Sequence, residues 1–520
     1  MRRTARRGHP GAMTAGTFSH STMTTAAGCN EPVPSPRLGI ALIALAAVAL
    51  ELAVSARYGY VRDELYFLSA GQHLAPGYVD QPALTPLLAR FSSIVFGNTV
   101  VGLRVLPAVS LGAIVLLTAA MSRRLGAGRA GQLLAAAAAA TCAQYLGAAH
   151  ELTTTVPDFL LWAVALYLVV RLLDSGNPRW WLAIGLTVGV SSAAKWNIAF
   201  LVALLAVGFA ATDGRRLLRS RYLLLGCLLA SVLAAPDLIW QAAHGWPAMD
   251  VFAALQQAAG HNRATYWLAQ VLFTGLALTP VWVTGLVWVL RSPSALRFRP
   301  AAIGCGLVVL LQFVLGGKAY YPGGAYSFLL AAGAVPIGGF LAARGRRVLV
   351  GAVAALAVSA AVIVPVALPV LPARVLHTVP LQKVNYDLGE EIGWPAEVAL
   401  VAREYRALPA AERQDTTVLA GNYGEAGALA RFGPADGLPA AYSGANNFWL
   451  WGPPPARDVD AIAVNPDLRM LRREFTTVRL VATYSNGLGV SDDEEAAQIY
   501  VATGLRSSWA SVWPAFRDYA

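Results

Sequence analysis

The segment Tyr60-Val-Arg-Asp-Glu-Leu-Tyr66, with Tyr78-Val-Asp-Gln-Pro82 shortly after it, follows the first long apolar run of the chain, residues 38–56. Its acidic residues fall where the chain would leave a membrane span: Asp63, Glu64 and Asp80. Carboxylates at that depth are costly and are retained mainly where they act. The stretch therefore predicts a membrane-embedded bundle that carries a functional site near one end.

The composition supports a membrane protein with many spans. Of 520 residues, 56% are hydrophobic and 13% are charged, and the mean hydropathy is +0.52. Soluble domains carry about 25% charged residues. The four cysteines are scattered without metal-ligand spacing, which favours small core residues over a disulfide framework or a zinc site: Cys29, Cys142, Cys227 and Cys305.

The formal charge of +11 does not indicate nucleic-acid binding once it is divided along the chain. Residues 371–520 hold 13 basic and 18 acidic residues, whereas residues 1–370 hold 27 basic and 11 acidic ones. The excess of positive charge belongs to the apolar part, where the positive-inside rule accounts for it.

The ends of the chain differ from its apolar middle. Residues 1–36 lack an apolar h-region and read as a disordered cytoplasmic tail, with Met13 or Met23 as alternative starts. Residues 371–520 alternate short apolar stretches with helical ones, which predicts an α/β or α+β domain. Residues 37–370 remain as the transmembrane domain.

About eleven candidate spans follow from runs of roughly 20 apolar residues, some of them short. They are 38–56, 99–121, 130–149, 156–171, 180–194, 197–212, 221–240, 267–290, 301–316, 325–343 and 348–370. With a cytoplasmic N-terminus, the arginine-rich loops near residues 123–129, 171–179, 215–221, 291–299 and 344–347 all lie inside. The C-terminal domain is then extracytoplasmic.

The opposite, outer face collects the unusual polar residues: Asp63, Glu64, Asp80, His150, Glu151, Asp158, Lys195, Asp237, His244 and Lys318. A random scatter of polar residues would not sort by side. The pattern predicts one site at the outer rim of the bundle.

The loop 57–98 contains an amphipathic helix beginning near Leu65, and Pro76-Gly77 turns the chain back toward the membrane. Asp63 and Asp80 would then face one cavity, where they suit general-base work, sugar hydroxyls or a divalent cation. Equally, Asp63 and Glu64 could cap the helix near its N-terminus. The local sequence leaves both interpretations open.

The motif Arg62-Asp-Glu-Leu-Tyr66, with Gly77-Tyr-Val-Asp-Gln-Pro-Ala-Leu84, resembles the first outer loop of glycosyltransferase family 39 and its PMT-type relatives. That group includes protein O-mannosyltransferases and the aminoarabinose transferases that act on lipid A. Further similar motifs follow in matching order: Val156-Pro-Asp-Phe-Leu-Leu161, Lys195-Trp-Asn197, Trp240-Gln-Ala-Ala-His-Gly-Trp-Pro247, Gly317-Lys-Ala-Tyr-Tyr321, Gly421-Asn-Tyr-Gly-Glu-Ala-Gly427 and Leu450-Trp-Gly-Pro-Pro454.

The resemblance implies a GT-C membrane glycosyltransferase that takes a hexosyl or pentosyl group from a polyprenyl-phosphate donor on the extracytoplasmic side. It implies that Asp63 acts as a base or positions the acceptor, that Glu64 completes the acidic pair, and that Asp80 is the second acid of the loop. Where the lipid A enzymes have Lys-Pro-Pro, this chain has Gln81-Pro-Ala, so the lysine's phosphate role is not carried over. Asp158 and His244 match further site residues.

Stabilising the donor phosphate requires cations. The candidate donor-binding residues are Arg62, Lys195, Lys318, Tyr320 and His244, and the further site candidates are Asp158, Gln81 and Tyr321. Each has a plainer interpretation. The lysines suit snorkelling, Arg62 could anchor the loop at headgroups, and His244 could be interfacial. The two tyrosines suit an aromatic belt, and Asp158 suits the first turn of a helix after Pro157.

The expected partners are the donor, the bilayer of the cell envelope and a glycan, lipid or protein acceptor, with a divalent cation as the one cofactor that the acids would suit. Two other functions remain. A transporter or flippase would bind near the midplane and show paired repeats, neither of which the sequence displays. A non-catalytic scaffold would leave the acids and lysines without a role.

Overall fold

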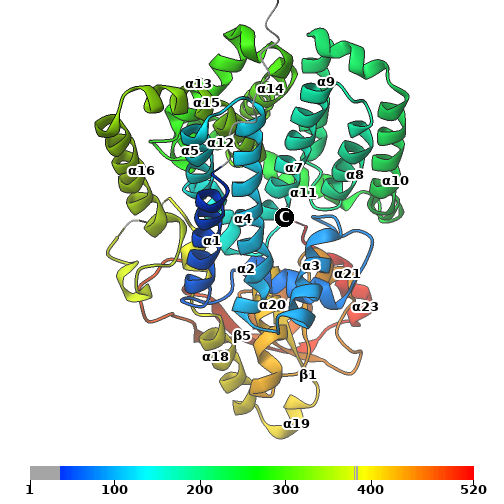
Figure 1. The fold of residues 1–520 in the computed structure, drawn as a ribbon. Helices are drawn as coiled ribbons and strands as arrows, with labels where there is room; N and C mark the ends of the chain where they lie inside the picture. Colours follow the sequence, from blue (N-terminus) through cyan, green and yellow to red (C-terminus); the bar gives the residue numbers. More distant parts are fainter. Residues whose placement is uncertain (1–35, 380, 382–383, 520) are drawn as a thin grey trace, which may run out of the picture.

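The computed structural model describes residues 36–379, 381 and 384–519. The predicted tail up to residue 35, with Cys29 and the alternative starts Met13 and Met23, lies outside the described residues. The described chain forms a bundle of helices with a smaller mixed domain at one end (Figure 1).

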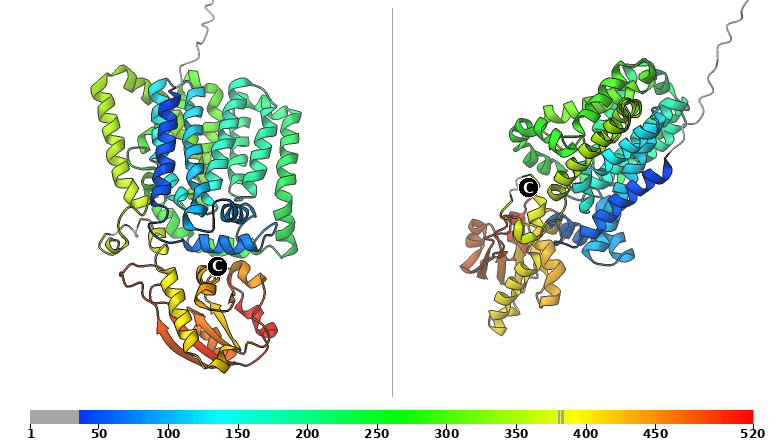
Figure 2. Two further views of the ribbon diagram at one scale, coloured as in Figure 1. Left: turned by 60° about the horizontal axis from the view of Figure 1, so that its bottom comes forward. Right: turned by 60° about the vertical axis from the view of Figure 1, so that its left-hand side comes forward.

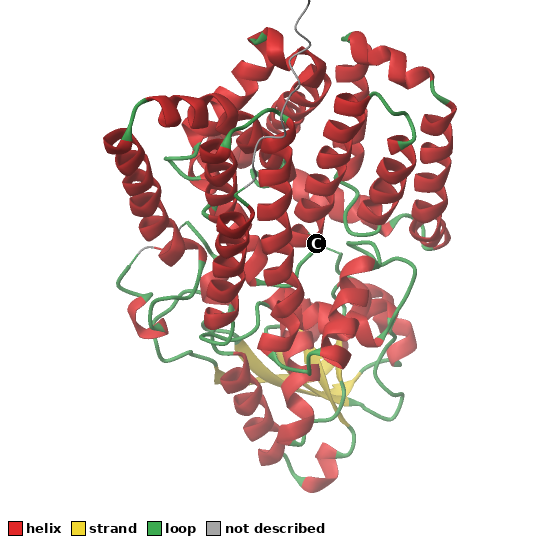
Figure 3. Ribbon diagram, in the orientation of Figure 1, coloured by secondary structure: helices red, strands yellow, loops and turns green. Residues whose placement is uncertain are grey.

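The bundle is built from apolar helices that run mostly side by side (Figures 1 and 3). They are α1 (Arg37–Val54), α4 (Val100–Arg124), α5 (Arg129–Ala140), α6 (Ala143–His150), α7 (Thr155–Ser175), α8 (Trp180–Ser192), α9 (Ile198–Ala210), α10 (Arg221–Ala243), α12 (Ala259–Thr274), α13 (Thr279–Arg291), α14 (Arg299–Leu315), α15 (Tyr326–Ala343) and α16 (Arg346–Ala367). Short helices complete the described chain: α11 (Pro247–Gln256), α17 (Asp387–Glu390), α19 (Ala410–Arg413), α21 (Asn446–Leu450), α23 (Trp509–Val512), η1 (Asp213–Arg219), η2 (Pro293–Phe298), η3 (Gly323–Ala325), η4 (Ala373–Val375), η6 (Gly433–Asp436) and η7 (Trp513–Phe516).

The number of spans is lower than the expected eleven. Within the described residues, seven helices are long and apolar enough to cross a membrane, or up to nine if each of two sharply bent pairs is one span. The predicted segment 130–149 is interrupted between α5 and α6, and α8 has only 13 residues. At 1.5 Å per residue, such a helix covers about two thirds of a 30 Å hydrocarbon core.

Glycines let the helices approach closely at their crossings. A Cβ on Gly185 of α8 would lie 2.2 Å from the carbonyl oxygen of Gly226 on α10, and one on Gly333 of α15 would lie 1.8 Å from that of Val281 on α13. Small residues at helix contacts are the usual means of packing in membranes, where apolar surface alone gives little drive to associate.

Two helices of the first outer loop lie between the bundle and the smaller domain, α2 (Arg62–Gln72) and α3 (Leu84–Val95) (Figure 2). The expected helix near Leu65 is therefore present, and it begins at Arg62. The expected turn is present as well: an antiparallel bridge joins Gly77 to Pro82, and the Tyr78 N–H donates to the carbonyl of Gln81 at 3.0 Å.

The smaller domain, called the outer domain below, is a mixed five-stranded sheet with helices α18 (Trp394–Ala407), α20 (Tyr423–Phe432) and α22 (Leu468–Glu474). The strand order is β2-β1-β3-β5-β4, from β1 (Thr416–Ala420), β2 (Ala441–Ser443), β3 (Asp460–Val464), β4 (Phe475–Thr483) and β5 (Gln498–Leu505). β1 is parallel to β2 and β3, whereas β5 is antiparallel to both its neighbours. The predicted α/β or α+β domain is thus confirmed.

Candidate active site

A cavity of about 400 Å³ lies where the outer end of the bundle meets the outer domain. Its wall comes from seven regions: the start of α2, α6, the start of α7, the end of α12, the turn after α14, the end of α16 and the segment around α17. Tyr423 of α20 also lines it. The cavity is therefore shared between membrane bundle and outer domain.

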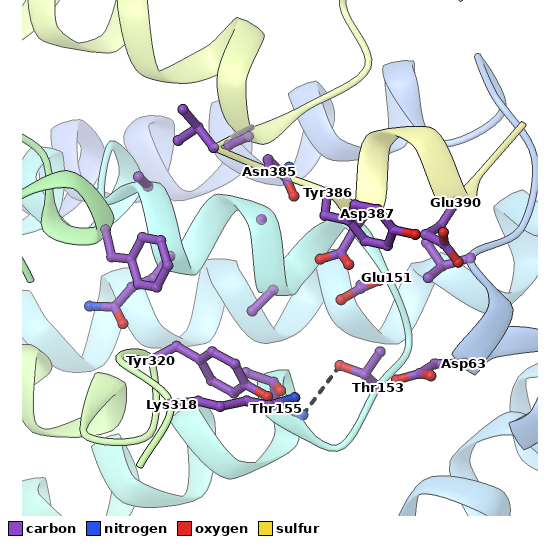
Figure 4. A pocket seen from close by; sticks show the side chains of 18 of the residues that line it. Asp63, Glu151, Thr153, Thr155, Lys318, Tyr320, Asn385, Tyr386, Asp387 and Glu390 are labelled. Carbon is purple, nitrogen blue, oxygen red and sulfur yellow. Dashed lines mark hydrogen bonds between the residues drawn. The ribbon is translucent and has the colours of Figure 1, made fainter. Parts of the chain in front are cut away.

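One side of the cavity is acidic, with Asp63, Glu151, Asp387 and Glu390 (Figure 4). Burial and the nearby carboxylates of Asp387 and Asp63 raise the pKa of Glu151 well above the ordinary range. Desolvation and the Asp63 carboxylate raise the pKa of Asp387 to about 6. These groups can hold protons near neutral pH, so they can both donate to and accept from sugar hydroxyls.

Asp63 and Glu64 have separate environments, although they are neighbours in α2. The Asp63 side chain lines the cavity and its Oδ1 accepts a hydrogen bond from the Tyr423 hydroxyl at 2.9 Å. Glu64 is fully buried, and its carboxylate caps the helix by accepting from the Val61 N–H at 3.0 Å. The capping interpretation therefore holds for Glu64, and the cavity interpretation for Asp63.

Glu64 also belongs to a buried ion network centred on Arg104 of α4. Arg104 donates to both Glu64 oxygens at 3.0 and 2.7 Å and to Glu391 at 3.2 Å. His150 Nε2 lies 2.7 Å from the same guanidinium, and His150 Nδ1 lies 3.4 Å from Glu51 of α1. The network ties the loop, three bundle helices and the segment before the outer domain together.

Asp80 does not line the cavity, which corrects the expectation that Asp63 and Asp80 face one space. Its Oδ1 accepts from the Tyr66 hydroxyl at 2.9 Å, and Asn446 Nδ2 lies 3.4 Å from its Oδ2. Gln241 Nε2 donates to the carbonyl of Tyr78 at 2.7 Å, which fastens this turn to α10.

Asp80 gives a testable dependence of stability on pH. Burial raises the pKa of Asp80 to about 7. The folded protein then holds a proton that the unfolded chain has lost above about pH 4, so this contribution to stability is lost as the pH rises toward 7. We expect the apparent melting temperature to fall between about pH 5 and about pH 8, and to fall less in Asp80→Asn. Parallel curves for the two proteins would contradict this.

Arg62 lines the cavity but is already paired. It lies 3.5 Å from Glu390, forms an ion pair with Asp493, and stands 5.5 Å from the ring of Tyr423. The predicted use of Arg62 as a phosphate clamp would require it to leave these carboxylates. Its present contacts fasten α2 to the outer domain.

The cationic side of the cavity is formed by Lys318, with Tyr320 beside it (Figure 4). Lys195 lies behind them, with its Nζ 5.1 Å from the ring of Tyr320 and 5.0 Å from that of Tyr321. Lys195 and Tyr321 do not line the cavity. Lys318 is therefore the lysine placed to meet a ligand, whereas Lys195 packs against the rings of Tyr320 and Tyr321.

Three further predicted residues lie away from the cavity lining. Asp158 is buried in the first turn of α7, where Asn197 Nδ2 lies 3.4 Å from its Oδ2. Gln81 is buried, and its amide has no hydrogen-bond partner among the described residues. His244 stacks on Trp240 with ring centroids 4.0 Å apart, as an interfacial histidine would.

Several cavity residues were not predicted as site residues: Gln144, Glu151, Thr153, Thr155, Asp387, Glu390 and Tyr423. The sequence does point to Glu151, since it belongs to the polar residues expected on the outer face. Asp387 and Glu390 follow the last span, and the rise in acidic residues after position 370 was their only signal. Gln144 lies in an alanine-rich run, and both its amide atoms are buried without a partner in the described chain.

The described residues contain no group of three or more His, Cys, Asp or Glu side chains arranged to hold a metal ion. The acids on the cavity wall come from separate loops, and their neighbours are hydroxyls, Arg62 and Lys318. A donor set of this kind suits hydrogen bonding to a polar ligand.

Comparisons with known proteins show which fold this arrangement of helices has. Residues 80–240 match the model of the dolichyl-phosphate-mannose-protein mannosyltransferase family. The chain is also similar in structure to ArnT from Cupriavidus metallidurans bound to undecaprenyl phosphate, with a TM-score of 0.57 over 89% of this chain and 97% of that one. The chain has the GT-C fold. The predicted resemblance and the polytopic membrane architecture are thereby confirmed.

The GT-C fold is shared at low sequence identity. ArnT in the complex with undecaprenyl phosphate is 16% identical in sequence to this chain. The same enzyme in the apo state is 15% identical, with a TM-score of 0.56 over 89% of this chain and 98% of that one. No curated protein matches the chain by sequence. These values establish the fold.

Proposed function

We propose that this protein is an integral-membrane glycosyltransferase that moves a sugar from a polyprenyl-phosphate donor to an acceptor hydroxyl on the extracytoplasmic face. The observation that carries the proposal is the cavity at the outer end of a GT-C bundle, with Asp63 on one side and Lys318 on the other. The ArnT structure with bound undecaprenyl phosphate supports a donor of the same chemical class.

The charges of the cavity match the charges of such a reaction. The acceptor oxygen forms a bond to the anomeric carbon as the bond from that carbon to the phosphate oxygen breaks. Asp63 accepts the proton of the acceptor hydroxyl. The released polyprenyl phosphate keeps the electron pair of the broken bond, and Lys318 stabilises the negative charge that develops there.

The remaining wall suits a neutral hexose or pentose. Gln144 offers an unpaired amide donor and acceptor, and Thr153 and Thr155 also line the cavity. Phe159 and Phe273 supply apolar surface against which a sugar ring can pack.

The proposed orientation places the N-terminus in the cytoplasm and the outer domain outside. Charge at the two ends of the bundle supports it. Arg124 at the end of α4 and Arg297 before α14 pair with Asp174 of α7, at 3.0 and 3.1 Å, at the end of the bundle opposite to Asp63. Arginine-rich ends of this kind remain on the cytoplasmic side.

Lys318→Met tests the cationic side of the cavity. We expect the variant to bind undecaprenyl phosphate about ten- to a hundredfold more weakly, because one charge-assisted hydrogen bond to phosphate is lost. Lys195→Met is the matched control, and its affinity should fall less because Lys195 does not line the cavity. Binding of the labelled lipid to purified protein measures both. Equal losses in the two variants would contradict the assignment.

The proposal includes a divalent cation only as an ion that binds together with the donor. An ion held by one or two cavity carboxylates and the donor's own phosphates would need no dedicated protein cage. Transfer after treatment with EDTA, and after Mg²⁺ or Mn²⁺ is added back, measures whether such an ion takes part.

Sugar transfer from a panel of radiolabelled polyprenyl-phosphate sugars tests the function itself. Membranes that contain the protein are compared with membranes that lack it, with label followed in glycan, lipid and protein fractions. We expect protein-dependent transfer from at least one donor. No transfer from any donor, combined with protein-dependent movement of the labelled lipid between leaflets, would favour a transporter instead.

A further inference from the structure

The motif Gly421-Asn-Tyr-Gly-Glu-Ala-Gly427 brings α20 of the outer domain into direct contact with α2. A Cβ on Gly424 would lie 2.8 Å from Cβ of Arg62, and one on Gly427 would lie 2.7 Å from the carbonyl carbon of Leu65. Only glycine permits so close an approach of one helix to the backbone of another. The motif thus forms a docking face for the helix that carries Asp63.

The same motif fixes where α20 begins. Asn422 Oδ1 accepts from the Glu425 N–H at 2.9 Å, while Glu425 Oε2 accepts from the N–H groups of Asn422 and Gly421 at 3.2 and 2.9 Å. A Cβ on Gly421 would lie 2.0 Å from the carbonyl oxygen of Asn465, which follows β3. This reciprocal cap sets the first helical residue, Tyr423, at the edge of the domain.

The Tyr423 side chain is held on both sides. Its ring centroid lies 5.3 Å from that of Tyr66, and the guanidinium of Arg62 lies 5.5 Å from the same ring. Its hydroxyl donates to Asp63 Oδ1 at 2.9 Å. Burial and the Asp63 carboxylate raise the pKa of Tyr423 well above its ordinary value, so the hydroxyl keeps its proton and remains a donor.

We propose that Tyr423 is a positioning residue for Asp63, and that the outer domain therefore completes the active site. The inference rests on the proposed function. The hydrogen bond from the Tyr423 hydroxyl to Oδ1 holds the Asp63 side chain in one rotamer. Oδ2 of Asp63 is then left to face an acceptor. The outer domain would then be required for turnover, beyond any part it has in binding the acceptor.

The charged and titratable groups that interact with Asp63 come from every element around it: Arg62, Asp80, Glu151, Lys195, Tyr320, Asp387 and Tyr423. Tyr423→Phe changes one of them and keeps the ring. The variant loses a hydrogen bond to the ionised carboxylate and leaves the other charges in place.

Sugar transfer by the full-length protein tests this role. In Tyr423→Phe we expect kcat to fall about tenfold or more with KM unchanged within about twofold, because the acid is misplaced but the donor site is intact. Tyr405→Phe is the control, since its hydroxyl donates at 2.9 Å to the Arg413 carbonyl within the outer domain.

If the wild type transfers sugar and Tyr423→Phe keeps more than half of the wild-type kcat, the inference is wrong and the function stands. A second measurement needs no activity. Melting temperatures of Asp63→Ala, Tyr423→Phe and the double variant form a cycle, because alanine at position 63 removes the acceptor of the Tyr423 hydroxyl. Non-additive shifts support the contact even if no donor is accepted, and additive shifts overturn it.

Discussion

Asp63→Asn should abolish most sugar transfer while the protein remains folded and inserted. A positioned general base contributes about 10²- to 10⁴-fold to rate, so we expect kcat to fall by at least about 10². Asparagine keeps the shape of the side chain and an oxygen that can accept from Tyr423, so packing changes little. Initial rates of transfer, with the melting temperature measured on the same preparation, separate the two effects.

Two variants serve as controls for this result. Asp415→Asn removes an exposed carboxylate before β1 and should transfer sugar at the wild-type rate. Glu64→Gln should lower the melting temperature, because it weakens the buried pairing with Arg104. Wild-type activity in Asp63→Asn would remove Asp63 from the mechanism.

Arg104→Met should be the most destabilising single substitution among those considered. Arg104 is 1% exposed and holds Glu64 and Glu391, which are themselves buried. Removal of one partner from a buried ion pair typically costs about 3–5 kcal/mol, because the remaining charge lies unpaired in a medium that solvates it poorly. We expect less protein in the membrane and an apparent melting temperature several degrees lower.

A second substitution distinguishes unpaired charge from lost packing. Arg104→Met combined with Glu64→Gln removes one of the stranded charges, so the double variant should melt above Arg104→Met alone. A double variant that melts lower than either single variant would contradict the electrostatic account. Retention of the wild-type melting temperature by Arg104→Met would show that the network adds nothing to stability.

Activity should fall together with stability in Arg104→Met. Each side-chain partner of Arg104 is close in sequence to an acid of the cavity: Glu64 to Asp63, His150 to Glu151, and Glu391 to Asp387 and Glu390. The guanidinium therefore fixes the backbone that carries the acidic wall, although it does not line the cavity itself.

The sequence predicts those parts of the molecule whose cause is local. Apolar runs predict the bundle, the helix near Leu65 and the strands of the outer domain, because hydropathy and periodicity act over a few turns. The place of Asp63 beside a membrane span predicts it as a site residue. The span count is too high because hydropathy does not show where a short helix such as α8 ends or where α5 breaks from α6.

Contacts between distant segments escape such reasoning. The apolar stretch 99–121 predicts a span, but the partners of Arg104 lie 40, 46 and 287 residues away. Tyr423 meets Asp63 across 360 residues, and a tyrosine in a glycine-rich turn has many other uses. The turn that carries Asp80 is held by Gln241, which is 163 residues from Tyr78 and which no local pattern connects to it.

The strand order has a consequence for how the protein is made. β5 lies between β3 and β4, so the sheet cannot close until residues 498–505 have left the ribosome. Asn446, with a left-handed φ of 43°, is held later still, since its N–H donates to the Asp518 carbonyl at 2.9 Å. A nascent chain with its membrane helices already inserted would thus carry Asp63 before the hydrogen bond from Tyr423 can form. The contact between Tyr423 and Asp63 would therefore form only after β5 has been made and has entered the sheet.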